Sequence, residues 1–228
     1  MTRAEEIASR VAQVKRRIAA AAVRSGRAED SVLLVAVGKR YPPADLFFAH
    51  AAGVRAFGEN RVQEAEEKFP HLPPDAARHL IGPIQSNKAN RAAKIASVVE
   101  TVDSLDLARR LDRAAAASGK RLTVFVQVRL GGEATKSGVE PDAASALVAS
   151  VRELPALDLR GLMAIPPPGD TRKHFAALRR LGEALGLREL SMGMSDDFES
   201  AIEEGATLVR VGSAIFGARD ISLPLANL

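Results

Sequence analysis

Lys39 is the residue of this chain whose position most strongly suggests chemistry. It comes directly after Gly38 and the continuous apolar run at residues 33–37. Such a run is typical of a parallel strand that is buried on both faces. A lysine at the end of a buried strand is costly to desolvate and is rarely left there without a partner. Lys39 therefore either reaches solvent at the tip of the strand or is held there for chemistry.

Two short turns in the last part of the chain combine glycine with serine. Gly193 and Ser195 follow one apolar segment, and Gly212 and Ser213 follow the next. Glycine lets the backbone approach a ligand closely, and a serine at the start of a helix offers its hydroxyl. Consecutive turns of this kind often hold a phosphate group in α/β barrels. Both serines could also be ordinary helix N-caps, but two such turns together favour a phosphate site.

Arg210 is the one charged residue in the apolar segment LVRVG at residues 208–212. On a regular strand it shares a face with Leu208 and Gly212, beside the expected phosphate site. Its guanidinium group cannot lose its charge, so it needs a partner. That partner is either a neighbouring Asp or Glu or a bound acceptor such as a ring nitrogen.

These residues together describe one ligand, with a phosphate, an acceptor nitrogen and a carbonyl group that an amine can attack. Pyridoxal 5′-phosphate (PLP) has all three features. We therefore expect a Schiff base on Lys39 and Arg210 facing the pyridine nitrogen. The phosphate is expected on the two glycine–serine turns: Gly193, Ser195, Gly212 and Ser213.

The segments that carry these residues alternate between strand and helix patterns along the chain. Strands are expected at residues 31–38, 54–58, 78–82, 98–102, 122–128, 157–165, 187–192 and 208–211. Helices are expected at residues 3–24, 42–53, 60–68, 87–96, 104–119, 141–151, 171–186, 195–204 and 213–216. The alternation predicts an α/β fold, a single (β/α)8 TIM barrel over residues 1–228 with an extra N-terminal helix. An open doubly wound sheet is less favoured, because no G-x-G-x-x-G follows the first strand.

Composition limits the classes of function. The chain has 228 residues and no cysteine, which fits a reducing cytoplasm. No apolar run is long enough to span a membrane, and the N-terminus has no apolar signal-peptide core. A net charge of +4 and a pI near 9.7 suggest nucleic acid binding. Against this, the basic residues are interleaved with 28 acidic ones, and with one tyrosine and no tryptophan few rings are available to stack on bases.

Several segments, in order along residues 7–219, resemble one known family. They are VAVGKR, FGENRVQEA, HLIGPIQSNK, TVDS, GGEATKSG, GLMAIP, LSMGMSDDFESAI and VRVGSAIFGAR. These motifs are similar to those of the pyridoxal phosphate homeostasis proteins, the PLP-binding barrels that resemble the N-terminal domain of alanine racemase. Departures from the family pattern are Arg78, Pro83 and Ser213, where tryptophan, histidine and threonine are common.

The resemblance implies a monomeric barrel that carries PLP on Lys39. It also implies phosphate contacts from Ser195, Gly212 and Ser213 and places Arg210 against the pyridine nitrogen. Three further residues are implied to line the cofactor: Asn60, Met163 and Met192. The family is thought to buffer PLP and to keep vitamin B6 and amino-acid pools in balance, with PLP-dependent apo-enzymes as possible recipients.

An arginine beside the pyridine nitrogen disfavours protonation of the ring, which makes the ring a weaker electron sink and suits narrow chemistry such as racemisation, or simple carriage. A racemase of this fold also needs a tyrosine from a second domain, whereas the one tyrosine here, Tyr41, is two residues after Lys39. We therefore expect a PLP carrier rather than an enzyme. The alternative is a PLP-dependent amino-acid racemase.

Overall fold

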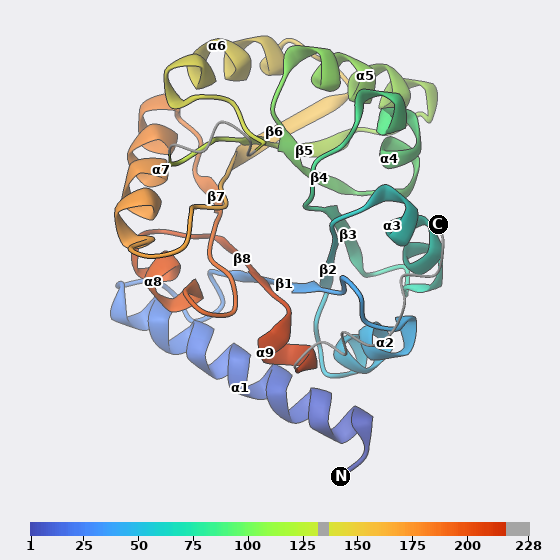
Figure 1. Cartoon of the computed structure of the whole chain (residues 1–228), viewed down its shortest axis with the longest axis vertical. Coiled ribbons are helices and arrows are strands. Elements are labelled where there is room, and N and C mark those ends of the chain that lie inside the picture. The colour runs from blue at the N-terminus through green and yellow to red at the C-terminus, as the bar shows by residue number, and fades with distance from the viewer. Residues whose placement is uncertain (132–136, 218–228) are drawn as a thin grey trace.

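The computed structural model describes residues 1–131 and 137–217. Residues 132–136 of the GGEATKSG motif lie outside the described residues, and so does the end of the VRVGSAIFGAR motif. The (β/α)8 barrel expected from the sequence is confirmed. Eight parallel strands form a closed ring in chain order, and helices surround it (Figure 1).

The strands are short, and each pairs with the next strand in the sequence. They are β1 (Leu33–Val37), β2 (Ala56–Glu59), β3 (Ala77–Leu80), β4 (Val98–Val102), β5 (Leu122–Gln127), β6 (Leu157–Met163), β7 (Glu189–Ser191) and β8 (Leu208–Val211). The first and last strands close the ring, with Val35 beside Arg210. Because all strands are parallel, their carboxyl ends meet at one mouth of the barrel.

The helices follow the strands in alternation, after one helix that precedes β1. They are α1 (Arg3–Arg24), α2 (Pro43–Ala51), α3 (Val62–Lys68), α4 (Ala89–Ile95), α5 (Leu105–Ala117), α6 (Pro141–Arg152), α7 (Arg172–Leu185), α8 (Phe198–Glu203) and α9 (Ser213–Phe216). Two 3₁₀ turns, Phe69–His71 and Ser86–Lys88, precede β3 and α4.

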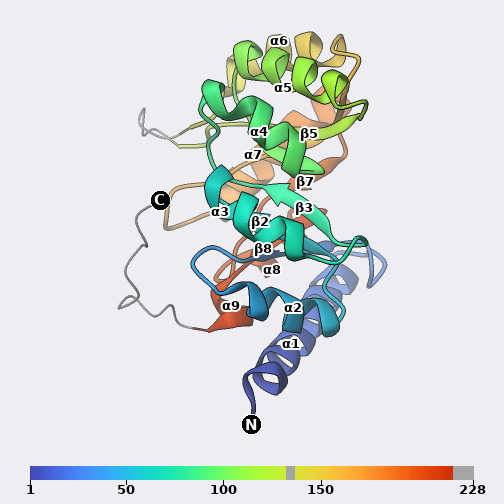
Figure 2. The ribbon, with the colours of Figure 1, turned by 90° about the vertical axis from the view of Figure 1, so that its right-hand side faces the viewer.

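The extra N-terminal helix packs against the outside of the barrel. A capping box between Thr2 and Glu5 starts α1, and an apolar stripe that includes Ile7, Val11 and Val14 is buried. The stripe packs against α2, α8 and α9, so the first helix covers the place where the ring of strands closes. Figures 1 and 2 show α1 and α2 at one side of the barrel and α5 and α6 at the opposite side.

The core has two layers, which follow from side-chain alternation along the strands. A small cluster fills the inside of the barrel: Val35, Ala56, Phe125, Met163 and Leu208. A larger apolar layer lies between strands and helices and includes Phe57, Leu162, Leu190 and Val209. The residue after Leu208 on the inner face is Arg210, so a buried cation stands above this inner apolar cluster.

Two expected helix starts are wrong. The helix expected to open at Ser195 begins at Phe198, because the Ser195 hydroxyl contacts the β8–α9 turn instead of its own helix. The helix expected to be capped by Ser86 begins at Ala89 after a 3₁₀ turn, with no side-chain cap. By contrast, Ser104 caps α5 as expected, since its hydroxyl accepts the N–H of Leu107 at 3.3 Å.

No helix within the described ranges combines the length and apolarity that a membrane crossing requires.

Candidate functional site

Lys39 lies in a tight turn directly after β1, at the mouth of the barrel, and its side chain is half-buried. The turn is closed by the N–H of Tyr41, which donates to the carbonyl of Gly38 at 2.9 Å. Arg40 has a positive φ of 65°, which is uncommon for a residue with a side chain. The turn is therefore held in a specific conformation by contacts around it.

The carbonyl of Gly38 also accepts a hydrogen bond from Lys68 of α3 at 2.7 Å. The same ammonium group contacts Glu59 at 3.0 Å and Glu64 at 2.6 Å. Glu59 is fully buried, and burial raises its pKa to about 8, although Lys68 and Lys39 act in the opposite direction. A group of titratable side chains thus lies directly behind the turn that carries Lys39.

Arg210 points into the barrel, where its guanidinium group contacts three polar groups. Its NH1 donates to the Ser191 hydroxyl at 2.5 Å and lies 3.8 Å from a carboxylate oxygen of Glu100. Its NH2 donates to the carbonyl of Ala164 at 2.8 Å. The acidic partner left open by the sequence is therefore Glu100, although 3.8 Å is a loose ion pair that leaves the guanidinium held mainly by Ser191 and Ala164.

Glu100 is the centre of this buried network. It contacts the His79 ring at 2.6 Å and accepts the hydroxyl of Ser191 at 2.5 Å. Burial alone would raise the pKa of Glu100, but His79, Arg210 and Ser191 outweigh it and hold the pKa below its ordinary value. Burial lowers the pKa of Arg210, while Glu100 and Asp197 oppose this. The network keeps a charged carboxylate and a charged guanidinium in the barrel interior.

The two glycine–serine turns meet at the mouth. The hydroxyl of Ser195 accepts the backbone N–H of Gly212 at 3.3 Å and that of Ala214 at 3.4 Å. The N–H of Arg210 in turn donates to the carbonyl of Gly193 at 3.0 Å. Ser213 is exposed at the first position of α9. The structure thus joins the turns after β7 and β8 into one unit whose backbone N–H groups converge on an oxygen.

The two glycines of this unit have different roles. Gly193 has a φ of +94°, and a Cβ there would lie 2.6 Å from the side chain of Ala201, so only glycine fits. At Gly212 a Cβ would lie 3.4 Å from the carbonyl of Val37, which is an ordinary contact. The requirement at Gly193 comes from packing against α8 and from backbone conformation.

The three residues that the resemblance places around the cofactor occupy different layers. Asn60 is half-buried just after β2, and its backbone lies against Gly82. Met163 is fully buried in the inner cluster at the end of β6. Met192, directly after β7, is fully buried in the layer between strands and helices. Their contacts with a cofactor stay a prediction.

Several residues of this region were not singled out from the sequence. They are His79, Glu100 and Ser191 beneath Arg210, and Lys68 and Glu64 behind Lys39. An isolated Glu or His on a short strand has no spacing that distinguishes it from a surface residue. The signal that was available is that Glu100 interrupts the apolar segment VVETV, as Arg210 interrupts its own.

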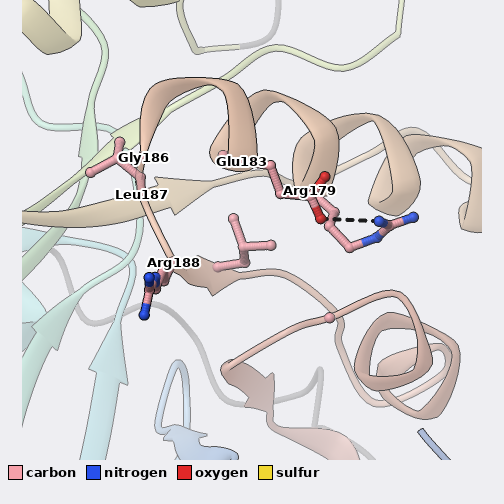
Figure 3. A pocket seen from close by; sticks show the side chains of 8 residues that line it. Arg179, Glu183, Gly186, Leu187 and Arg188 are labelled. Carbon is pink, nitrogen blue, oxygen red and sulfur yellow. Dashed lines mark hydrogen bonds and ion pairs between the residues drawn. The ribbon is translucent and has the colours of Figure 1, made fainter.

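A separate pocket of about 440 Å³ lies at the other end of the barrel (Figure 3). Arg179 and Glu183 of α7 line it, with Gly186, Leu187 and Arg188 ahead of β7. These residues precede the strand, so the pocket opens at the amino ends, away from Lys39 and Arg210. Within the described ranges, no group of three His, Cys, Asp or Glu side chains is placed to hold a metal ion.

Comparison with known proteins agrees with this geometry. The family model for the alanine racemase N-terminal domain matches residues 10–220. The pyridoxal phosphate homeostasis protein of Pseudomonas aeruginosa is 49% identical, over 96% of this chain and 98% of that protein. The chain belongs to the family of pyridoxal phosphate homeostasis proteins.

Two solved structures show how this family relates to others with the same barrel. PipY of Synechococcus elongatus PCC7942, solved with PLP bound, is 40% identical, with a TM-score of 0.80 over 92% of this chain and all of that one. An alanine racemase of Clostridium difficile 630 has a TM-score of 0.79 at 15% identity, over 96% of this chain and 58% of that one. The likeness to the racemase shows the fold alone.

Proposed function

We propose that this protein binds PLP at the mouth of its barrel, buffers and carries it, and so maintains vitamin B6 and amino-acid homeostasis. The observation that carries the proposal is the pairing of β1 with β8. Because Val35 lies beside Arg210, the turn with Lys39 and the guanidinium face the same mouth. The homeostasis-protein names of the relatives and the PLP in PipY support the same ligand.

The residues present fit the three parts of PLP. Lys39 supplies an amine for the aldehyde, and PLP supplies an electrophilic carbonyl and an aromatic ring when it is bound. The joined turns present the backbone N–H groups of Gly212 and Ala214 to an oxygen of Ser195, so they suit the oxygens of a phosphate. We assign the phosphate to Gly193, Ser195, Gly212 and Ser213 and the Schiff base to Lys39. Asn60, Met163 and Met192 are proposed to surround the ring.

Arg210 is proposed to face the pyridine nitrogen as a permanent cation. Ser191 and Ala164 fix its orientation, and Glu100 supplies a counter-charge within 3.8 Å. A cation at this place disfavours a proton on the ring nitrogen and so weakens the ring as an electron sink. A weaker electron sink suits carriage of PLP, and it also suits narrow chemistry such as racemisation.

The position of Tyr41 favours carriage of PLP over racemisation. Its hydroxyl donates to the carbonyl of Gly217 at 2.7 Å, and its ring lies 4.8 Å from that of Phe216. The side chain is only 6% exposed, so it is engaged with α9 rather than presented to the mouth as an acid or base. The racemase alternative therefore gains no support from this tyrosine.

We further propose that the protein is one domain, acts as a monomer in the cytoplasm, and passes PLP to PLP-dependent apo-enzymes. Ile165 after β6 and Met194 after β7 are large apolar side chains that are 39% and 40% exposed near the same mouth. They offer an apolar contact for a recipient protein. No role in binding nucleic acid is proposed.

The decisive experiment compares the wild type with Lys39→Ala after addition of PLP. The wild type should turn yellow, and borohydride should attach the cofactor to Lys39, as peptide mass analysis would show. The variant should stay colourless, and an unchanged spectrum would contradict the proposal. Incubation with L-alanine or L-serine, followed by chiral chromatography, tests the alternative, because turnover well above that of free PLP would indicate a racemase.

A further inference from the structure

Lys68 is a buried lysine whose three hydrogen bonds all involve the surroundings of Lys39. Its side chain is 6% exposed, at the end of α3. The ammonium group donates to the carbonyl of Gly38, to Glu59 and to Glu64, at 2.7, 3.0 and 2.6 Å. An ammonium group has three donors, so this set satisfies it completely. Because all three donors of this buried ammonium group are engaged, the Lys68 side chain is held in one position.

The same group of residues contacts the turn on the other side of Lys39. The carboxylate oxygen of Glu64 that accepts Lys68 also accepts the backbone N–H of Arg40 at 2.6 Å. Arg40 has the positive φ of 65°. A residue with a Cβ keeps this backbone conformation only where surrounding contacts hold it there. The residues before and after Lys39 are thus both bound to the hydrogen-bonded pair of Lys68 and Glu64.

Glu59 completes the arrangement from β2. A Cβ on Gly38 would lie 2.5 Å from one oxygen of Glu59, so the turn and the carboxyl group are in close packing. The other oxygen of Glu59 is buried and has no hydrogen-bond partner among the described residues. The charge of Lys39 is near enough to lower the pKa of this carboxyl group, against the larger effect of burial.

We propose that Glu59, Glu64 and Lys68, here called the Lys39 clamp, are positioning residues that hold Lys39 where its amine can reach the aldehyde of PLP. The inference rests on the proposed function and adds to it. In the step concerned, the lone pair of the Lys39 nitrogen attacks the aldehyde carbon, and a C=N bond replaces C=O. The oxygen leaves as water with two hydrogens from the amine nitrogen, so no oxidant or reductant is needed.

A clamp of this kind affects the covalent bond and leaves the other contacts of the ligand in place. Orientation of the reacting groups has a large influence on rate, and a misplacement of about 1 Å can cost about a hundredfold. The proposed phosphate contacts and Arg210 lie on β7, β8 and the turns that follow them, whereas Lys68 and Glu64 lie on α3. Of the residues proposed to surround the ring, Asn60 follows Glu59 at the end of β2. Loss of the clamp should therefore slow the reaction of Lys39 with little change in non-covalent affinity.

The test compares PLP with pyridoxine 5′-phosphate, which carries an alcohol in place of the aldehyde and cannot react with Lys39. In Lys68→Met, Schiff-base formation followed by stopped-flow absorbance should slow at least about tenfold. The Kd for pyridoxine 5′-phosphate should stay within about twofold of the wild type. Lys68→Arg keeps the charge and its donors and should recover part of the rate, because a longer, planar guanidinium only partly replaces a compact ammonium group.

Two further variants distinguish loss of the clamp from a general effect on folding. Glu64→Ala releases the N–H of Arg40 at a side chain that is 20% exposed, so folding is less affected, and it should also slow Schiff-base formation. Lys120→Met is the matched control, because Lys120 likewise donates to a backbone carbonyl, that of Ala96 at 2.8 Å, but lies ahead of β5 at the other end of the barrel. It should leave both measurements unchanged.

The results separate the clamp from the function on which it rests. Equal losses for both ligands in Lys68→Met and Glu64→Ala would show a general structural effect and would overturn the clamp. Unchanged rates in both variants would overturn it as well. A wild type that binds pyridoxine 5′-phosphate but never forms a bond with PLP would instead refute the role of Lys39.

Discussion

Glu100 of β4 and Arg210 of β8 meet inside the barrel, with a carboxylate oxygen 3.8 Å from a guanidinium nitrogen and the Ser191 hydroxyl bonded to both. The two strands lie on different sides of the ring, so the contact crosses the interior. Glu100 also holds His79 at 2.6 Å. His79, Glu100, Ser191 and Arg210 thus link β3, β4, β7 and β8 beneath the mouth.

We expect Glu100→Leu to destabilise the protein by about 3–5 kcal/mol, because it leaves the buried Arg210 without its counter-charge. Glu199→Leu, which breaks an ion pair with Arg17 on the surface, should cost about 1 kcal/mol or less. Urea denaturation of both variants measures the difference. Similar small losses in the two variants would mean that the interior network contributes little to stability.

The raised pKa of Glu59 predicts a pH dependence of stability. Its pKa is about 8 in the folded protein against an ordinary value of 4.5, so the folded state binds one more proton between these two values. The contribution of Glu59 to the free energy of unfolding is fully present below a pH of about 4.5 and is lost as the pH rises toward about 8. The free energy of unfolding falls by at most about 1.4 kcal/mol per pH unit in this range.

Glu59→Gln carries no titrating group and should remove this part of the dependence. The wild type should therefore lose stability relative to Glu59→Gln as the pH is raised from 5 to 8, a range chosen to lie between about 4.5 and about 8. Denaturation curves at four or five pH values give the comparison. Parallel pH profiles of the two proteins would show that Glu59 has an ordinary pKa.

Ser195→Ala should weaken PLP binding about 10- to 150-fold, since one hydrogen bond to a charged group contributes about 1.5–3 kcal/mol. The Ser195 hydroxyl joins the two turns that we assign to the phosphate. Unlike the clamp variants, Ser195→Ala should weaken pyridoxine 5′-phosphate to the same extent, which titration calorimetry would measure. Ser150→Ala, on the exposed side of α6, is the control. A loss confined to PLP would contradict a phosphate role.

Gly193→Ala should destabilise the protein more than Gly119→Ala. Both glycines have positive φ values, +94° and +63°, so both variants meet backbone strain of about 1–2 kcal/mol. Only at Gly193 would the new Cβ also collide with α8, 2.6 Å from Ala201, whereas Gly119 has open space. Thermal denaturation of both variants tests this. Equal losses would show that α8 moves aside without cost.

The sequence by itself determined the barrel and the identity of the chemically unusual residues. Eight apolar segments alternating with amphipathic ones can bury their faces in few ways, and a closed parallel ring satisfies all of them. Lys39 and Arg210 were visible because a charge in an apolar strand is costly and therefore informative. Gly193 and Ser195 stood out for their types and spacing within one short segment.

Only the tertiary structure decided which partners these residues have. Glu100 reaches Arg210 from a strand more than a hundred residues earlier, and Lys68 reaches Gly38 from a neighbouring helix. Such contacts depend on barrel closure and strand register, which have no local signature in the sequence. The start of α8 was misplaced for the same reason, because the hydroxyl of Ser195 is used by the turn after β8, a partner that only the closed ring brings beside it.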